Sequence, residues 1–178
     1  DPVLLQQWNN YKDDINNSID LRNARAAIFQ SIKNDERNYG SKIRLSDDDL
    51  KSVFPLHPYA AIMLKNMSVV FSSNARSMFD FIISNDTTEA KGFKWFIENY
   101  GPTTPDHLLT IDMLWDYFTA KGQKLSDKVR TILDSYHLVR KGALQPESER
   151  VFKTVLLLEA VSQVVSNVSL LRPTSQNI

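Results

Sequence analysis

The amino-acid sequence predicts an all-α fold, an irregular multi-helix bundle of about eight or nine helices. Apolar residues recur at steps of three and four along nearly the whole chain, which is the spacing of a helical face. The alternation that is typical of strands is hard to find, and Pro, Gly and short Ser/Asn/Asp clusters interrupt the helical spacing. We therefore expect one helical domain over residues 1–178, in which any subdivision falls near residues 85–88.

Two N-terminal helices follow from this spacing. Pro2 suits a first helical position, because its missing N–H has no partner there in any case. The apolar stripe of that helix is Leu4, Trp8, Tyr11, Ile15 and Ile19. A second helix is predicted over 20–35, and the Asn-Tyr-Gly sequence at 38–40 interrupts it. Its buried side is Leu21, Ala24, Ile28 and Ile32.

Three shorter helices are predicted between residues 46 and 83. Ser46 can cap the first by accepting a hydrogen bond from the amide three residues on, and the aspartates at 47–49 face the positive end of the helix dipole. That helix must end by Pro55. Pro58 opens the next helix, whose buried side is Ala60, Ile62, Met63, Met67, Val70 and Phe71. After an interruption at 72–74, helical spacing continues through Met78, Phe79, Ile82 and Ile83.

The C-terminal half is expected to hold the remaining helices. Their starts are predicted at 87–89, at 104–105 and Thr110, at Ser126 and at Pro146. The residues expected to face inward are Phe93, Phe96, Ile97, Tyr100, Ile111, Leu114, Trp115, Phe118, Val129, Ile132, Leu133, Tyr136, Val151, Val155, Leu158, Val161 and Val165. We interpret the aromatic cluster Trp115, Tyr117 and Phe118 as core, the alternative being an interface to a neighbouring domain.

The composition excludes several classes of function. Twenty-one basic residues balance twenty-one acidic ones, so no overall field attracts nucleic acid or anionic lipid. The lack of cysteine removes disulfides and thiolate chemistry, and it fits a reducing cytoplasm. No apolar run approaches the roughly 20 residues of a membrane span. We expect a cytoplasmic protein without membrane contact.

The sequence contains no complete catalytic site and no metal site. Its five glycines lie too far apart to form a phosphate-binding P-loop or a dinucleotide fingerprint. His57, His107 and His137 are scattered at spacings that make no metal site. The aspartates at 47–49 can be imagined as a Mg²⁺ site, but adjacent acids at a helix start diverge around the axis, and helix capping is the preferred interpretation. Whether the chain belongs to an enzyme stays open at this point.

The densest basic stretch carries Lys121, Lys124, Lys128 and Arg130. Such a helix can contact the phosphate backbone of DNA or RNA. It lacks interleaved exposed aromatic residues, however, so a solvated helix face is the plainer interpretation.

Four blocks of sequence stand out. They are FPLHPYAAIML at 54–64 with SSNARSMFDF at 72–81, LTIDMLWDYF at 109–118, RVFKTVLLL at 150–158, and LRPT at 171–174 followed by Asn177 and Ile178. In this order they resemble the signature of large bacterial P-loop ATPases of the AAA+-like kind, which include the ATPase subunits of BREX-type phage-defence systems and related uncharacterised ATPases. The sequence departs from that signature at Ser73 and Ala75, where the family usually has Gln and Glu.

The resemblance implies that this chain is a fragment of a larger protein, the helical region that follows the nucleotide-binding core and is comparable to an AAA+ lid. It implies ATP and Mg²⁺ as ligands of the whole protein and the upstream P-loop domain as a partner. Arg76 is the candidate nucleotide-sensing residue, since it lies in the first turn after the break at 72–74. Asn74 would orient this arginine or touch phosphate, and His57 would hold the preceding turn. The alternative is that Arg76 pairs with Asp80, one helical turn on.

Three functions therefore remain open. The first is a helical lid or regulatory region of a cytoplasmic P-loop ATPase in phage defence, with DNA as a further partner of the whole protein. The second is a helical module that holds a protein partner or self-associates through an exposed apolar patch, expected around Trp115 and Phe118. The third is nucleic-acid contact through the helix from Lys121 to Arg130.

Overall fold

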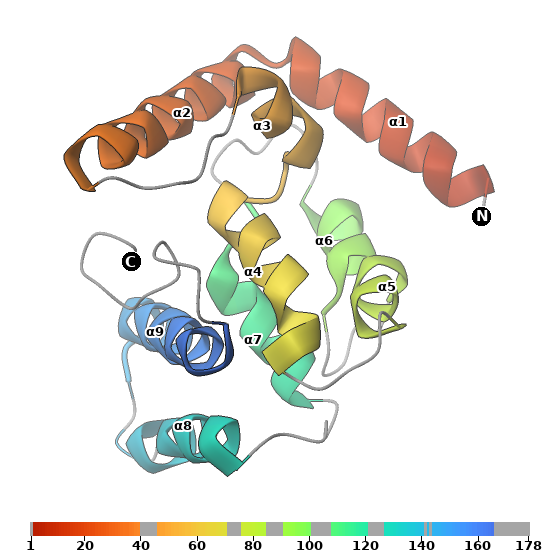
Figure 1. The fold of residues 1–178 in the computed structure, drawn as a ribbon. Helices are drawn as coiled ribbons and strands as arrows, with labels where there is room; N and C mark the ends of the chain where they lie inside the picture. Colours follow the sequence, from red (N-terminus) through yellow and green to blue (C-terminus); the bar gives the residue numbers. More distant parts are fainter. Residues whose placement is uncertain are drawn as a thin grey trace.

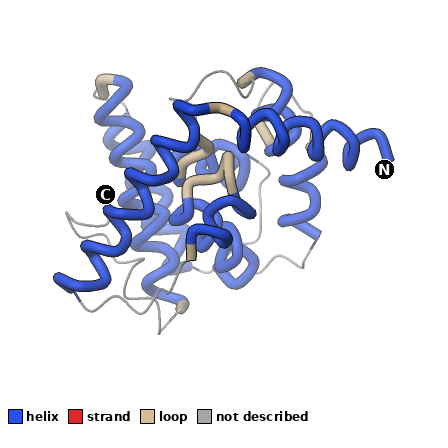
Figure 2. The backbone as a smooth tube through the Cα atoms, turned by 90° about the horizontal axis from the view of Figure 1, so that it is seen from above, coloured by secondary structure: helices blue, strands red, loops and turns tan. Residues whose placement is uncertain are grey.

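The computed structural model describes residues 2–39, 46–70, 76–84, 91–100, 108–120, 127–140, 142 and 144–165. These residues form nine α-helices and no β-strand, which confirms the predicted fold class (Figures 1 and 2). The helices are α1 (Pro2–Asn17), α2 (Ile19–Tyr39), α3 (Asp47–Val53), α4 (Pro58–Val70), α5 (Arg76–Ile83), α6 (Phe93–Asn99), α7 (Ile111–Ala120), α8 (Asp127–Arg140) and α9 (Pro146–Val164). Within the described part of the chain, no helix has both the length and the apolar character needed to cross a membrane.

Three helices form the centre of the molecule. α4, α7 and α9 pack against one another, α8 lies against α9, α5 lies against α4, and α6 lies against α5 (Figure 1). Their side chains build one large hydrophobic cluster, in which Phe81 packs against both Tyr117 and Phe118. Trp115 is 3% exposed and Phe118 is 1% exposed. The core interpretation of these aromatics is therefore right, and the exposed patch expected around Trp115 and Phe118 is wrong, because both side chains are needed to fill the space between α7 and its neighbours.

A second layer, made of α1, α2 and α3, lies over one end of this core (Figure 1). Ser18 separates α1 from α2, and its hydroxyl accepts a hydrogen bond from the amide of Leu21 at 3.3 Å. Leu21 of α2 and Phe54 after α3 form a smaller buried cluster, with Ile28, Ile97 and Leu108 packed against it. α2 is thus anchored to the body through a few large apolar side chains.

Several predicted boundaries and faces need correction. α2 continues to Tyr39, beyond the predicted end at 35. α6 begins at Phe93 and not at 87–89, because Gly92 before it is extended, with φ −87° and ψ −174°. Two residues assigned to apolar stripes face solvent: Ile19, at the start of α2, is 65% exposed, and Val151 is 49% exposed. The middle of α9 is buried instead through Leu156, Leu157 and Leu158.

Some predictions lie outside the residues or side chains that the structure describes. They are the apolar positions Leu4, Trp8, Tyr11, Ile15, Val70 and Phe71, the starts at 104–105 and Ser126, and the subdivision near 85–88.

Candidate functional site

The N-terminal ends of α4 and α7 are joined by backbone hydrogen bonds. The amide of His57 donates to the carbonyl of Leu109 at 2.9 Å, and the amide of Leu109 donates to the carbonyl of Pro55 at 3.0 Å. Leu56 and Leu109 form the isolated parallel bridge between these segments. Each segment leads directly into a helix, so the positive ends of two helix dipoles lie side by side.

His57 caps α4. Its Nδ1 accepts a hydrogen bond from the amide of Tyr59 at 3.2 Å, and its carbonyl accepts one from the amide of Ala61 at 3.0 Å. Burial lowers the pKa of His57 from 6.5 to about 4, so the ring is neutral at pH 7. Because Nδ1 is an acceptor, the single ring proton resides on Nε2, which makes this nitrogen a hydrogen-bond donor.

His57 also lines a small polar pocket of about 210 Å³. The pocket is lined by His57 and Tyr59, by Thr110, Ile111 and Asp112 at the start of α7, and by Arg150, Val151 and Thr154 of α9. Arg150 Nε donates to Asp112 Oδ2 at 2.9 Å, and the Thr110 hydroxyl donates to the other oxygen of the same carboxylate. The pocket combines a neutral imidazole, hydroxyl groups and one balanced ion pair. It is therefore suited to hydrogen bonding a polar group and carries no net charge of its own.

Three of the four sequence blocks meet in this pocket. Residues 54–64 supply its imidazole, residues 109–118 supply its carboxylate, and residues 150–158 supply its guanidinium. The spacing of residues within each block gave no sign of this meeting. The three blocks are brought together by the bridge between Leu56 and Leu109 and by the packing of α9 against α7.

Of the three predicted nucleotide-sensing residues, Arg76, Asn74 and His57, only His57 lines this pocket. α5 begins at Arg76, as the break at 72–74 suggested, but the side chain of Arg76 and the whole of Asn74 lie outside the described structure. His57 precedes the N-terminal end of α4, and Arg76 follows its C-terminal end. Since α4 has 13 residues, these ends are about 20 Å apart. The pairing of Arg76 with Asp80 stays a prediction as well.

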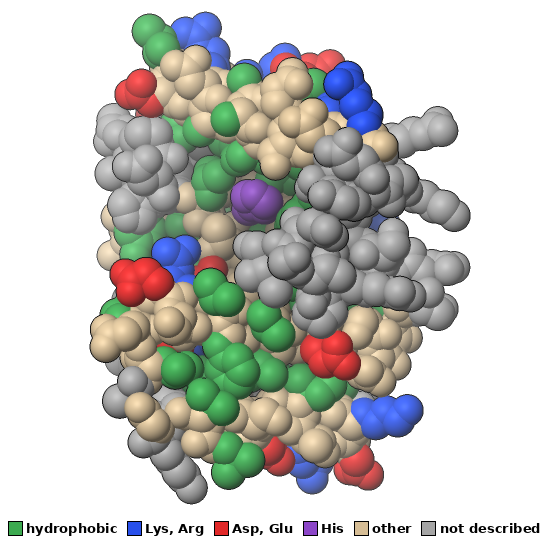
Figure 3. Space-filling model, turned by 90° about the vertical axis from the view of Figure 1, so that its left-hand side faces the viewer, with side chains coloured by type: hydrophobic (Ala, Val, Ile, Leu, Met, Phe, Trp, Pro, Cys, Tyr) green, Lys and Arg blue, Asp and Glu red, His purple; other side chains and the backbone are tan. Residues whose placement is uncertain are grey.

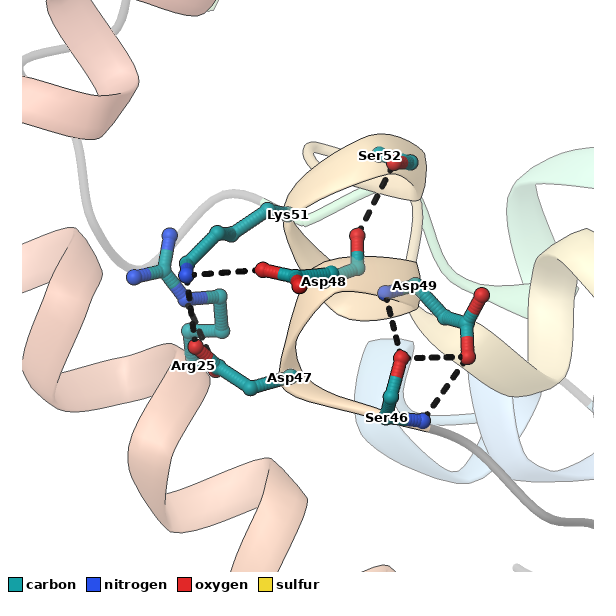
Figure 4. A network of polar contacts seen from close by, with 7 residues as sticks. All are labelled: Arg25, Ser46, Asp47, Asp48, Asp49, Lys51 and Ser52. Carbon is teal, nitrogen blue, oxygen red and sulfur yellow. Dashed lines mark hydrogen bonds and ion pairs between the residues drawn. The ribbon is translucent and has the colours of Figure 1, made fainter.

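The acidic sequence at 47–49 caps α3, as predicted (Figure 4). The Ser46 hydroxyl accepts a hydrogen bond from the amide of Asp49 at 3.1 Å, and the Asp49 carboxylate accepts one from the amide of Ser46 at 2.8 Å. These bonds to Ser46 hold the pKa of Asp49 below its ordinary value. The arrangement is a capping box, which satisfies amides at the start of the helix.

One member of this network could not be found from the sequence. Arg25 of α2 is 8% exposed, and its Nε lies 3.4 Å from Asp47 Oδ1 (Figure 4). Lys51 binds the other oxygen of Asp47 at 2.9 Å, and this hydrogen bond is the main cause that lowers the pKa of Asp47. Asp47 therefore links α2 to α3. Among the described residues, no group of three or more His, Asp or Glu side chains is arranged to hold a metal ion.

The basic stretch is only partly described. Lys128 and Arg130 are exposed on α8, whereas Lys121 and Lys124 lie outside the described residues. Nucleic-acid binding by this helix stays a prediction, and binding to a DNA or RNA duplex that weakens steeply as salt rises is its test.

Comparison of the chain with models of protein families, with curated proteins and with solved structures finds no match. The resemblance to large bacterial P-loop ATPases therefore stays a prediction from the four sequence blocks.

Proposed function

We propose that this chain is the helical lid or regulatory region of a larger cytoplasmic P-loop ATPase of the BREX phage-defence type. In this role it couples the nucleotide state of the upstream domain to movement of neighbouring domains or subunits. The observation that carries the proposal is the meeting of three sequence blocks around His57, Asp112 and Arg150. Blocks that resemble one family and also build one pocket are better support than similar blocks scattered over the surface.

The chemistry required of this chain is limited. ATP and Mg²⁺ are held by the P-loop domain, because the glycine spacing here forms no phosphate cradle. The chain supplies a cation, Arg76, at the start of an eight-residue helix. A guanidinium can bind phosphate oxygens bidentately and stabilise the negative charge on a phosphoryl group during transfer. The packed α4, α7 and α9 provide the rigid body that would move with it.

The test is Arg76→Ala in the protein that also carries the P-loop domain. Because an arginine of this kind contributes about 10³-fold or more to turnover, we expect kcat for ATP hydrolysis to fall by that order while the melting temperature stays nearly unchanged. Lys128→Ala, which removes an exposed cation from α8, is the matched control and should leave kcat unaltered. Turnover in Arg76→Ala equal to that of the wild type would remove the sensing role.

A second function, a helical module for protein–protein contact, is favoured by a specific feature. Hydrophobic side chains gather on the lower half of the face in Figure 3, at the level of α8 and α9. The exposed apolar residues of these helices include Leu138 at 69%, Val139 at 40% and Val151 at 49%. Exposed apolar patches of this kind mark interaction surfaces.

Self-association is the direct test of this second function. If the patch over α8 and α9 pairs with a second copy, sedimentation velocity should show concentration-dependent association that Leu138→Ser weakens. Ile83→Ser on α5, whose side chain is 56% exposed, removes a comparable apolar surface elsewhere and serves as the control. Association that both variants weaken equally would argue against a specific patch.

A further inference from the structure

The polar pocket lined by residues of α4, α7 and α9 has more hydrogen-bond donors than its own residues use. Arg150 binds Asp112 through Nε alone, and within the described part of the chain its two terminal amino groups have no partner. Among the same residues, no partner is found for Nε2 of His57, which carries the ring proton, or for the hydroxyl of Thr154. These side chains line one pocket, so a single ligand with acceptor oxygens is able to bind all three.

The acceptors of the polar pocket are already occupied. One oxygen of Asp112 accepts a hydrogen bond from Arg150 Nε, and the other accepts one from the Thr110 hydroxyl. The Asp112 side chain is 12% exposed, so little of its surface is open to a donor from outside. Nδ1 of His57 accepts the amide of Tyr59. The pocket therefore favours a ligand that accepts hydrogen bonds over one that donates them, such as an ammonium group.

The charges of the lining residues decide which kind of acceptor fits. Among the described residues that line the pocket, Arg150 is the cation and Asp112 is the anion. A doubly charged phosphate would meet the Asp112 carboxylate without a surplus of positive charge to offset the repulsion. A carboxylate brings only one negative charge. Its two oxygens match the spacing of guanidinium amino groups, which bind carboxylates bidentately through strong, charge-assisted hydrogen bonds.

The size of the pocket limits the ligand to a small molecule. Its volume of about 210 Å³ lies below the roughly 300–1,000 Å³ that is typical of pockets for drug-sized ligands. Beside the polar groups, the walls include Ile111 and Val151, and Val151 is 49% exposed. A short alkyl group placed against these two side chains would remove apolar surface from water.

We propose that the polar pocket binds a small monocarboxylic acid in its ionised form. The carboxylate accepts hydrogen bonds from Arg150, His57 and Thr154, and the alkyl part packs against Ile111 and Val151. Because the lining residues come from α4, α7 and α9, the bound acid stabilises the packing of the three central helices. This inference needs no nucleotide and stands independently of the ATPase proposal.

Titration of the 178-residue chain with propanoate tests the proposal by ¹H–¹⁵N NMR. We expect the amide shifts of residues 110–112 and 150–154 to change and to saturate in the millimolar range. Propanamide has the same shape without the charge, so it should bind at least about tenfold more weakly. Inorganic phosphate should also bind more weakly than propanoate. Shifts that do not saturate, equal binding of propanamide, or tighter binding of phosphate would each overturn the proposal.

Two variants show whether binding occurs in this pocket. Arg150→Ala should weaken propanoate binding at least about tenfold, because it removes the charged donors. Thr154→Val keeps the shape of the side chain and removes the hydroxyl, so we expect binding to weaken by about three- to tenfold. Thr131→Val is the matched control, since the Thr131 hydroxyl donates to the Asp127 carbonyl on α8, outside the pocket. Unchanged affinity in Arg150→Ala, or equal weakening in Thr154→Val and Thr131→Val, would contradict the proposed site.

Discussion

His57 stabilises both local and tertiary structure. Its ring caps α4, and its backbone amide donates a hydrogen bond to the carbonyl of Leu109. The ring can accept the Tyr59 amide only while Nδ1 is unprotonated. A histidine at this position therefore makes helix capping sensitive to pH, which a serine or asparagine would not do.

The pKa of His57 gives the direction of that sensitivity. The unfolded chain binds a proton near pH 6.5, whereas the folded chain does so only near pH 4. Between these values the unfolded state holds more protons, so the contribution of His57 to stability is fully present above pH 6.5 and is lost as the pH falls to 4. The loss should approach about 3 kcal/mol in the free energy of unfolding.

His57→Asn separates this effect from the titration of carboxylates, because asparagine is a good cap that does not titrate. Urea midpoints measured at pH 7 and pH 4.5 should differ more in the wild type than in the variant. If both proteins lose the same stability over this interval, His57 is not the group responsible.

Gly92 is required by the close approach of α5 and α6. A Cβ at this position would lie 2.6 Å from the carbonyl oxygen of Phe81 and 2.8 Å from atoms of Ser84, and two of these three contacts are backbone oxygens that cannot turn aside. We expect Gly92→Ala to destabilise the protein by about 1–3 kcal/mol in urea denaturation, the usual cost of overpacking. Gly142→Ala is the control, since its nearest contact is 3.3 Å and the site is exposed. A cost at Gly142 as large as that at Gly92 would contradict this explanation.

At the scale of elements, α9 is held on α7 by two ion pairs one turn apart. Arg150 binds Asp112, and Lys153 Nζ lies 2.8 Å from Asp116 and 3.2 Å from Glu149. The cations differ in exposure, since the side chain of Arg150 is 63% exposed and that of Lys153 is 13% exposed, whereas the carboxylates differ in the opposite sense, with Asp112 12% and Asp116 49% exposed. Burial alone would lower the pKa of Lys153, but the hydrogen bonds and charge of its partners raise it above the ordinary value.

This difference predicts that alanine substitutions of Arg150 and Lys153 lower the free energy of unfolding by unequal amounts. Arg150→Ala should cost about 1 kcal/mol, because water solvates most of the guanidinium and the Thr110 hydroxyl still donates to the Asp112 carboxylate. Lys153→Ala should cost about 2 kcal/mol, because it removes a shielded ammonium and leaves two carboxylates without their shared partner. Lys153→Met retains the packing of the stem and should recover part of the loss in urea denaturation. Equal costs for the two alanine variants would show that burial does not decide the strength of these pairs.

Local signals predicted most of the elements. Ser46, Pro58 and Pro146 mark helix starts through capping or proline chemistry that needs no tertiary contact, and all three helices begin where expected. The errors lie where tertiary packing decides. Val151 fits a helical stripe by spacing, yet it faces the rim of the polar pocket.

At the scale of the whole molecule, the candidate site was harder to predict than the fold. His57 could be selected from its sequence block, but its partners come from 53 and 93 positions further along the chain, at Thr110 and Arg150. No periodicity links such distant residues. Arg25 illustrates the same limit, since a cation on an amphipathic helix is expected in solvent until Asp47 is brought against it.

The division of the core into two clusters predicts a stepwise loss of structure. Leu21 belongs to the small cluster under α2, and Leu157 belongs to the large cluster that joins α4, α7 and α9. Leu21→Ala should weaken the packing of α2 by about 2–4 kcal/mol. Hydrogen exchange of the α2 amides should then be faster by about 30-fold or more, while the slowest amides of α7 keep their exchange rates. Leu157→Ala, an equal truncation in the large cluster, should speed exchange in α4, α7 and α9 together. If Leu21→Ala accelerates α7 as much as α2, the two layers unfold as one cooperative unit, and α2 is not the weaker part of the fold.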